Sequence, residues 1–213
     1  GITEGNRQTH SLGMTLDQLV KPKKYNAYPD LWLSQAPPGE RLQEYVQREW
    51  EGLPHEGETP PEAMSEALRY AEQAVASINA AAGLVRSNVE EFERLRNDIH
   101  CIQAMSRHYA AKADAAGLVL RHRLGKNPND LRRAAERLED SLTHYRQLTR
   151  LTEGTYRFAN SLQIGHRRIP FRGVIDDEPA YFHWRQVEPR FEKELKQFLQ
   201  QLSDDRAATD GDE

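Results

Sequence analysis

Cysteine is almost absent from this chain: Cys101 is the only one among 213 residues. A single cysteine excludes an intramolecular disulfide and any metal site built from several thiolates. Cys101 lies in an apolar stretch of a predicted helix, where a small thiol is typically buried. We therefore expect a structural thiol at this position.

Long hydrophobic runs are also missing. One of the most apolar windows, AVASINAAAGLV, is too short and too rich in alanine to span a bilayer. No signal peptide is recognisable, and the chain opens on Gly1 and runs directly into ITEGNRQTH. We therefore expect a piece of a longer polypeptide that carries a cloning remnant, so the missing leader says nothing about that protein's destination.

An excess of positive charge is the third absence. The formal net charge is -4 and the isoelectric point is near 6.1. Proteins that bind duplex nucleic acid usually present a strong basic field, so a nucleic-acid partner is disfavoured. Hydrophobic content of 38% with 29% charged residues describes a polar but foldable protein.

Motifs for catalysis, metals and cofactors are lacking as well. The sequence contains no GxSxG, no SxxK and no Walker phosphate loop. His100 and His108 are eight residues apart on one predicted helix, but neither belongs to an HExxH or Glu-x-x-His pair. We expect surface or core-edge histidines, no metal and no cofactor. Helical carboxylates that alternate with arginine, such as Glu91 and Glu136, are typical of a solvated face.

Hydrophobic periodicity dominates what is present. Apolar residues recur at spacings of three and four over about 60–85, 89–124 and 127–162, with shorter patterns over 39–50 and 186–202. No stretch of four to eight residues alternates convincingly, and only GVI and RIPF have strand character. The sequence therefore predicts an all-α fold: an antiparallel bundle of three long helices, shorter N- and C-terminal helices, and an irregular N-terminal arm.

Helix boundaries and faces follow from the same pattern. Thr59 before two prolines, with Glu62 three residues on, predicts a capped helix start. Asn127 or Asn129 should cap the start of the helix predicted over about 127–162. Gly125 should stand just beyond the end of the helix predicted over about 89–124. Gly154 suggests a kink. The expected core stripe of the 89–124 helix is Phe92, Leu95, Ile99, Ile102, Met105, Tyr109, Ala113, Ala116, Leu120 and Leu124.

The chain divides into three parts. Residues 1–36 form an irregular arm rich in aromatics and proline, in which MTLDQLV predicts one or two helical turns. Tyr25, Tyr28 and Trp32 are too apolar to be left in water, so we expect them to contact a neighbouring domain. Residues 37–202 form the helical domain. Residues 203–213 form an acidic tail that is expected to be disordered.

One segment, residues 165–185, follows no helical stripe. Arginine and histidine side chains lie beside aromatic ones here, a combination suited to an acidic sugar, phosphate or carboxylate. The alternative is structural: Asp176, Asp177 and Glu178 would neutralise the arginines, and the aromatics would seal the end of the bundle. The candidate ligand-binding residues are His166, Arg167, Arg168, Arg172, His183, Trp184 and Arg185.

Two passages carry a family resemblance. The opening TEGNRQTHSLGM and the ending YRQLTRLTEGTYRFANSLQIGHRRIPFRG, followed by HWRQVEPRFEKEL, resemble the C-terminal helical region of large, secreted, multi-domain bacterial proteins of the glycoside-hydrolase type. In such proteins a helical module follows a catalytic barrel. The resemblance implies a carbohydrate-active protein exported from the cytoplasm. It assigns no catalytic role to any residue of this chain.

Four functions are compatible with these features. The first is a non-catalytic helical module that packs on or borders the catalytic domain of a polysaccharide-processing protein. The second is a self-contained binding module that takes an anion or acidic sugar at residues 165–185. The third is a scaffold or oligomerisation bundle, since long striped helices can self-associate. A helical enzyme that uses only histidines and carboxylates is the fourth alternative. The expected partners are a preceding domain and carbohydrate, with no membrane span.

Overall fold

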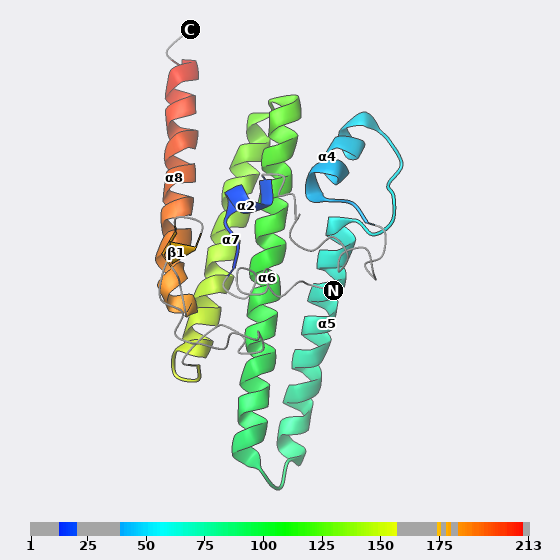
Figure 1. Cartoon of the computed structure of the whole chain (residues 1–213), viewed down its shortest axis with the longest axis vertical. Coiled ribbons are helices and arrows are strands. Elements are labelled where there is room, and N and C mark those ends of the chain that lie inside the picture. Colours follow the sequence, from blue (N-terminus) through cyan, green and yellow to red (C-terminus); the bar gives the residue numbers. More distant parts are fainter. Residues whose placement is uncertain (1–12, 21–38, 157–173, 176–177, 180–182, 211–213) are drawn as a thin grey trace.

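Four long helices lie side by side in the order α5, α6, α7 and α8, each antiparallel to its neighbour (Figure 1). The computed structural model describes residues 13–20, 39–156, 174–175, 178–179 and 183–210. Within them the predicted all-α class is confirmed. The helices are α2 (Leu16–Val20), α4 (Leu42–Glu51), α5 (Pro60–Ala81), the short 3₁₀ turn η1 (Ala82–Leu84), α6 (Val89–Gly125), α7 (Pro128–Glu153) and α8 (Trp184–Asp210).

The shorter elements lie against this row. α2 contacts α6 and α4, and α4 contacts α6. α5 and α8 lie at opposite edges of the row in Figure 1, so the described helices form an open array. β1 (Val174–Ile175) pairs antiparallel with β2 (Glu178–Pro179), which confirms the strand character of GVI. No helix of the described part is long and apolar enough to cross a membrane.

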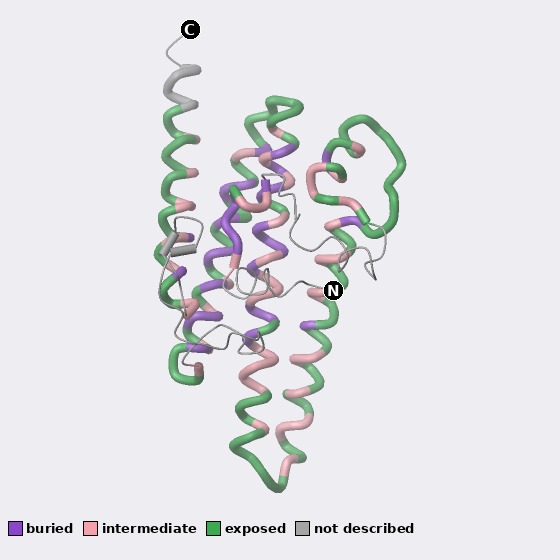
Figure 2. Tube along the Cα trace, in the orientation of Figure 1, coloured by how far each residue is buried: buried purple, intermediate pink, exposed green. Residues whose placement is uncertain are grey.

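Buried residues concentrate on α6, α7 and the segment through α2 (Figure 2). One cluster joins α2 and α4 to α6 and α7, and the other joins α6, α7 and α8. The first holds Leu16, Val20, Val46, Ala115, Ala116, Leu118, Leu120, Ala134 and Leu138. The second holds Cys101, Ala104, Leu142, Tyr145, Leu148, Val187 and Phe191. Cys101 is buried as predicted, and burial, followed by the charge of Asp98, raises its pKa to about 11.

Local sequence explains where α5 and α7 begin. The Glu62 carboxylate accepts hydrogen bonds from the backbone N–H and the hydroxyl of Thr59, at 3.0 and 2.7 Å. The Asn127 side chain accepts the backbone N–H of Asn129 at 3.0 Å. Both predicted caps are therefore confirmed. They satisfy N–H groups that have no partner in the first helical turn.

The prediction that α6 ends at Leu124, with Gly125 just beyond it, is wrong by one residue. Gly125 is the last helical residue, and Lys126 adopts the left-handed conformation at φ 54°. A Cβ on Gly125 would lie 2.6 Å from the Trp50 ring, so glycine lets α4 approach the end of α6.

The ends of α7 and α8 differ from the prediction. α7 ends at Glu153, so Gly154 follows the helix and does not kink it. Residues 157–162, the end of the predicted run, lie outside the described residues. α8 extends to Asp210, which places the predicted boundary at residue 203 inside a helix. The segment QLSDDRAATD contains no glycine or proline, and its Gln, Leu, Arg and Ala residues favour a helix.

The predicted core stripe of α6 is wrong in part. Leu95 and Ile102 are 51% and 61% exposed, whereas Ala104 and Ala115 are buried. The face of α6 that packs on α7 carries small residues, which let the two backbones approach closely. Periodicity predicts burial of the larger apolar side chains of α6, whereas tertiary packing buries several of the smaller ones. On α7, in contrast, the apolar residues that recur at spacings of three and four are buried from Ala135 to Leu148, as the periodicity over 127–162 predicts.

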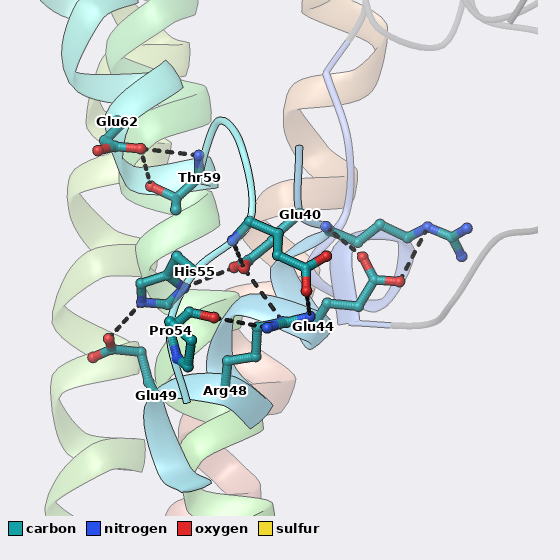
Figure 3. A network of polar contacts seen from close by, with 10 residues as sticks. Glu40, Glu44, Arg48, Glu49, Pro54, His55, Thr59 and Glu62 are labelled. Carbon is teal, nitrogen blue, oxygen red and sulfur yellow. Dashed lines mark hydrogen bonds and ion pairs between the residues drawn. The ribbon is translucent and has the colours of Figure 1, made fainter. Parts of the chain in front are cut away.

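A charged network, the α4–α5 clip, fixes the loop between α4 and α5 (Figure 3). It comprises Glu40, Arg48, Glu49, His55 and Glu56. The Glu40 carboxylate lies 2.8 Å from Nδ1 of His55 and accepts the Glu56 N–H at 2.7 Å. Glu49 lies 2.7 Å from Nε2 of the same ring, and Arg48 lies 3.4 Å from Glu40. The loop is therefore tied to both ends of α4.

Two pKa shifts accompany the clip. Hydrogen bonds to Glu49 and then to Glu40 raise the pKa of His55. Burial alone would raise the pKa of Glu40, but hydrogen bonds from Glu56 and His55 and the charges of His55 and Arg48 outweigh it and lower that pKa. The clip is therefore strongest when His55 is an imidazolium and Glu40 is a carboxylate.

The clip should make stability depend on pH. A raised folded pKa stabilises the protein below the unfolded value, about 6.5 for histidine, and this contribution is lost as pH rises through the folded pKa. Glu40, whose pKa is lowered from about 4.5, stabilises the protein above that value, and this contribution is lost as pH falls through the folded pKa. We expect His55→Gln to reduce the fall in melting temperature between about pH 6 and 9. If the melting temperature fell by the same amount in wild type and variant across this pH range, the assignment of this pH dependence to His55 would be contradicted.

Candidate functional site

A buried ion pair joins α6 to α8. Nζ of Lys112 lies 2.5 Å from Oε2 of Glu194, and the Lys112 side chain is only 2% exposed. The ammonium also lies 3.9 Å from the centroid of the Phe191 ring. Oε1 of Glu194 accepts the backbone N–H of Leu16 at 2.5 Å. Glu194 therefore binds the N-terminal segment and α6 at once.

The electrostatics of this pair follow from burial. Burial lowers the pKa of Lys112, and the negative charge of Glu194 opposes the shift without cancelling it. The nearby charge of Arg190 lowers that pKa further. Removing either partner would leave a charge or a polar group without its counterpart in a place shielded from water.

A histidine and a serine meet beside this pair, in a geometry that superficially suggests nucleophilic catalysis. Nδ1 of His108 lies 2.9 Å from Oγ and 3.1 Å from the carbonyl oxygen of Ser141. Both residues are completely buried, and the His108 ring packs against the rings of Tyr145 and Phe191, which also contact each other. Burial, followed by the charge of Lys112, lowers the pKa of His108 to about 3. A neutral, enclosed imidazole cannot meet a substrate, so this contact is structural. The prediction of a surface or core-edge position is wrong for His108.

Residues 13–20, here called the N-terminal anchor, are held against the helices. Met14, Leu16 and Val20 are buried, at 6%, 8% and 1% exposed. The Gln43 side chain donates to the Val20 carbonyl at 2.6 Å. The predicted short helix in MTLDQLV is confirmed as α2. Residues 13–20 are therefore held at a defined position against the helices.

An open groove of about 640 Å³ lies between the anchor and α8. On α8, Gln186, Arg190, Lys193 and Gln197 recur at spacings of four, three and four, which places them on one helix face. The opposite wall is formed by residues 15–17 of the anchor. We call this feature the α8 groove.

Three of the predicted ligand-binding residues lie where α8 begins. His183 accepts the backbone N–H of Arg185 on Nδ1 at 3.1 Å, and Arg185 pairs with Glu153 at 2.6 Å. Trp184 is partly buried and packs edge-on against Tyr156, with 5.8 Å between ring centroids. The structure therefore brings His183, Trp184 and Arg185 together around the junction of α7 and α8.

The remaining predicted site residues lie outside the described residues. These are His166, Arg167, Arg168 and Arg172 of the ligand-binding set and Tyr25, Tyr28 and Trp32 of the domain-contact set. They stay predictions. In the part of the chain that the structure describes, no group of three or more His, Cys, Asp or Glu residues is arranged to hold a metal ion.

Sequence reasoning missed Lys112 and Glu194. A signal was present in both helices: Lys112 interrupts the small-residue run AAKADAAG, and Glu194 lies within the apolar stripe that contains Phe191. Lysine and glutamate are almost never fully buried unless they are paired. Opposite charges at core positions of two helices therefore indicate that the helices meet there.

The described residues define an antiparallel helical unit with an anchored N-terminal segment. The chain matches no protein-family profile and no curated protein. Among solved structures it is similar to a GH138 enzyme targeting pectin rhamnogalacturonan II, with a TM-score of 0.82 and 38% sequence identity. The match covers 95% of this chain but only 29% of that protein. The chain is therefore related to part of a glycoside hydrolase, as the sequence resemblance suggested.

Proposed function

We propose that this chain is a non-catalytic helical module of a larger, secreted polysaccharide-processing protein, and that it packs on or borders the catalytic domain. The observation that carries the proposal is the similarity of nearly the whole chain to less than a third of a glycoside hydrolase. That enzyme targets a pectin. An acidic plant polysaccharide is the substrate class we propose for the protein to which this module belongs.

The ion pairs of two shielded glutamates support a non-catalytic role for them. Glycoside hydrolases generally use two carboxyl groups that flank the scissile bond. Glu194 and Glu40 are the best-shielded described glutamates that bind cations of the chain: Glu194 binds Lys112, and Glu40 binds His55 and Arg48. Each carboxylate is paired within the fold, so neither is available to protonate or attack a sugar.

Two features support contact with a neighbouring domain. The N-terminal anchor fixes the point where a preceding polypeptide would meet the helices. The end of the α5–α6 hairpin exposes Leu84 at 75% and Val89 at 53%. Further along α6, Leu95 and Ile102 are also exposed. Apolar surface of this kind is typical of an interaction site. Tyr25, Tyr28 and Trp32 are proposed to add to such a contact.

The proposal is tested in the GH138 enzyme itself. The region that matches this chain is deleted, or replaced by this chain, and sugar release from rhamnogalacturonan II is measured. We expect the deletion to abolish soluble active enzyme and the replacement to restore activity to within about tenfold, a barrier difference of about 1.4 kcal/mol. The 213-residue chain alone should release nothing. Release that persists after repurification of the isolated chain would overturn the non-catalytic assignment.

A further inference from the structure

One side of α6 is covered along only part of its length. Leu95, Ile102, Tyr109 and Ala116 recur at intervals of seven residues, which places them on one side of the helix. Ala116 lies in the cluster that joins α2 and α4 to α6 and α7, and α2 and α4 lie along the upper half of α6 in Figure 1. Leu95 and Ile102, in contrast, are 51% and 61% exposed, and Tyr109 is partly buried. We call these last three residues the Leu95–Tyr109 stripe.

Two polar groups beside this stripe already have partners within the chain. Asp98 is three residues from Leu95 and four from Ile102, and its carboxylate accepts a hydrogen bond from the Tyr156 hydroxyl. The Ser106 hydroxyl donates to the Ile102 carbonyl at 2.9 Å. Burying a polar group is costly chiefly when it loses its hydrogen bond. Another protein surface can therefore cover the stripe without depriving these two groups of their partners.

The small size of the stripe favours a partner in the same polypeptide. From Leu95 to Tyr109 it extends for about 20 Å along the helix. A stable complex of two separate chains buries about 800 Å² on each partner, contributed by about 20–30 residues. A covalently linked domain is present at an effective concentration of about millimolar, so a smaller apolar contact is sufficient to hold it.

The N-terminal anchor meets the helices close to this stripe. Gly13 lies against Phe191 and Tyr145, and both of these rings contact His108 of α6. His108 is less than two helical turns from Ile102. In the similar GH138 enzyme, more than two thirds of the polypeptide lies outside the region that matches this chain. That enzyme therefore has ample polypeptide for a domain next to its helices.

We propose that the Leu95–Tyr109 stripe binds an apolar patch on the neighbouring domain of the same polypeptide. The inference rests on the proposed function, which supplies the neighbouring domain. It explains why the hydrophobic pattern predicts burial of Leu95 and Ile102 although no described element covers them. The stripe is the continuation of a helix face that α2 and α4 cover further along.

The test is hydroxyl-radical footprinting of two proteins: the 213-residue chain alone, and the GH138 enzyme in which it replaces the matching region. Side-chain oxidation is measured by mass spectrometry. We expect Leu95 and Ile102 to react readily in the isolated chain and at least about fivefold less in the replacement enzyme, because a packed contact excludes water. Leu199, which is 40% exposed on α8, is the internal control and should react equally in both proteins.

A pair of matched variants gives a second readout. Leu95→Glu places a carboxylate in the proposed contact, and Leu199→Glu makes the same chemical change on α8. Both isolated variants should keep wild-type helicity by circular dichroism, because both leucines are exposed. In the replacement enzyme, Leu95→Glu should lower the midpoint of thermal inactivation by several degrees more than Leu199→Glu, since it buries a charge without a partner.

Three results would overturn the inference. They are equal oxidation of Leu95 and Ile102 in the two proteins, equal losses in the two variants, and protection of the stripe already in the isolated chain. The last result would assign the cover to this chain itself, as a second copy if light scattering shows a dimer.

The outcomes also separate this inference from the proposed function. An active replacement enzyme without protection of the stripe rejects the stripe alone. A soluble but inactive replacement enzyme that protects the stripe rejects the proposed function and keeps the contact surface, and one without protection rejects both.

Discussion

Glu194→Ala is expected to destabilise the folded chain by about 3–5 kcal/mol. The variant leaves the Lys112 ammonium, which is 2% exposed, without its partner. It also removes the acceptor of the Leu16 N–H, so the N-terminal anchor loses a contact at the same time. Urea unfolding followed by circular dichroism gives the free energy of unfolding for wild type and variant.

Two further variants show whether the loss of stability comes from the unpaired buried charge or from any substitution in α8. Glu192→Ala removes an exposed carboxylate that pairs with Arg146 on the surface, and should change stability by less than about 1 kcal/mol. The double replacement Lys112→Met with Glu194→Leu should be much less destabilised than Glu194→Ala, since hydrophobic residues often replace a buried pair without loss. Equal losses for Glu192→Ala and Glu194→Ala would contradict the account of the buried pair.

Gly13→Ala is expected to cost about 2–4 kcal/mol and to loosen the N-terminal anchor. Gly13 has a φ of 98°, a conformation that residues with a Cβ disfavour. A Cβ would also lie 2.9 Å from the Phe191 ring and 3.1 Å from that of Tyr145. Both rings are buried, so they have little freedom to move aside. Hydrogen exchange at the Leu16 amide reports the anchor, and urea unfolding reports global stability.

The control for Gly13 is Gly83→Ala. A Cβ on Gly83 meets nothing within 4 Å, and its φ is not positive. Alanine there should be neutral or slightly stabilising, because it restricts the unfolded chain. If Gly13→Ala kept both wild-type stability and wild-type protection of Leu16, the anchor would not be fixed in the way described.

Local rules predicted much of the helical framework. Thr59, Glu62 and Asn127 cap their helices as expected, because capping depends on residues only two or three positions apart. The stripe on α7 from Ala135 to Leu148 is buried as predicted, and its larger residues lie in the two hydrophobic clusters. The position of Cys101 was also predictable, as a small thiol on an apolar helix.

The failures arose where distant parts of the chain decide the outcome. Which face of α6 is buried depends on where α7 packs, and Leu95 and Ile102 are left exposed as a result. Lys112 and Glu194 are 82 residues apart, so neither has a local reason to be buried. The α8 groove likewise forms only because the anchor returns to pack beside α8.

The candidate binding segment was predictable only in part. Arginines and aromatics between 165 and 185 drew attention to the start of α8, and the α8 groove begins directly after that segment, at Gln186. The groove residues on α8 follow an ordinary helical spacing, so the sequence did not distinguish them from other polar residues of that helix. His166, Arg167, Arg168 and Arg172 stay predictions for the same neighbourhood.

The most direct test of the central claim is sugar release from rhamnogalacturonan II by the GH138 enzyme in which this chain replaces the matching region. If this chain is a helical module of the same kind, the replacement restores activity to within about tenfold of the intact enzyme, while deletion abolishes it. A soluble replacement enzyme with no activity, or a deletion variant as active as the intact enzyme, would contradict the account.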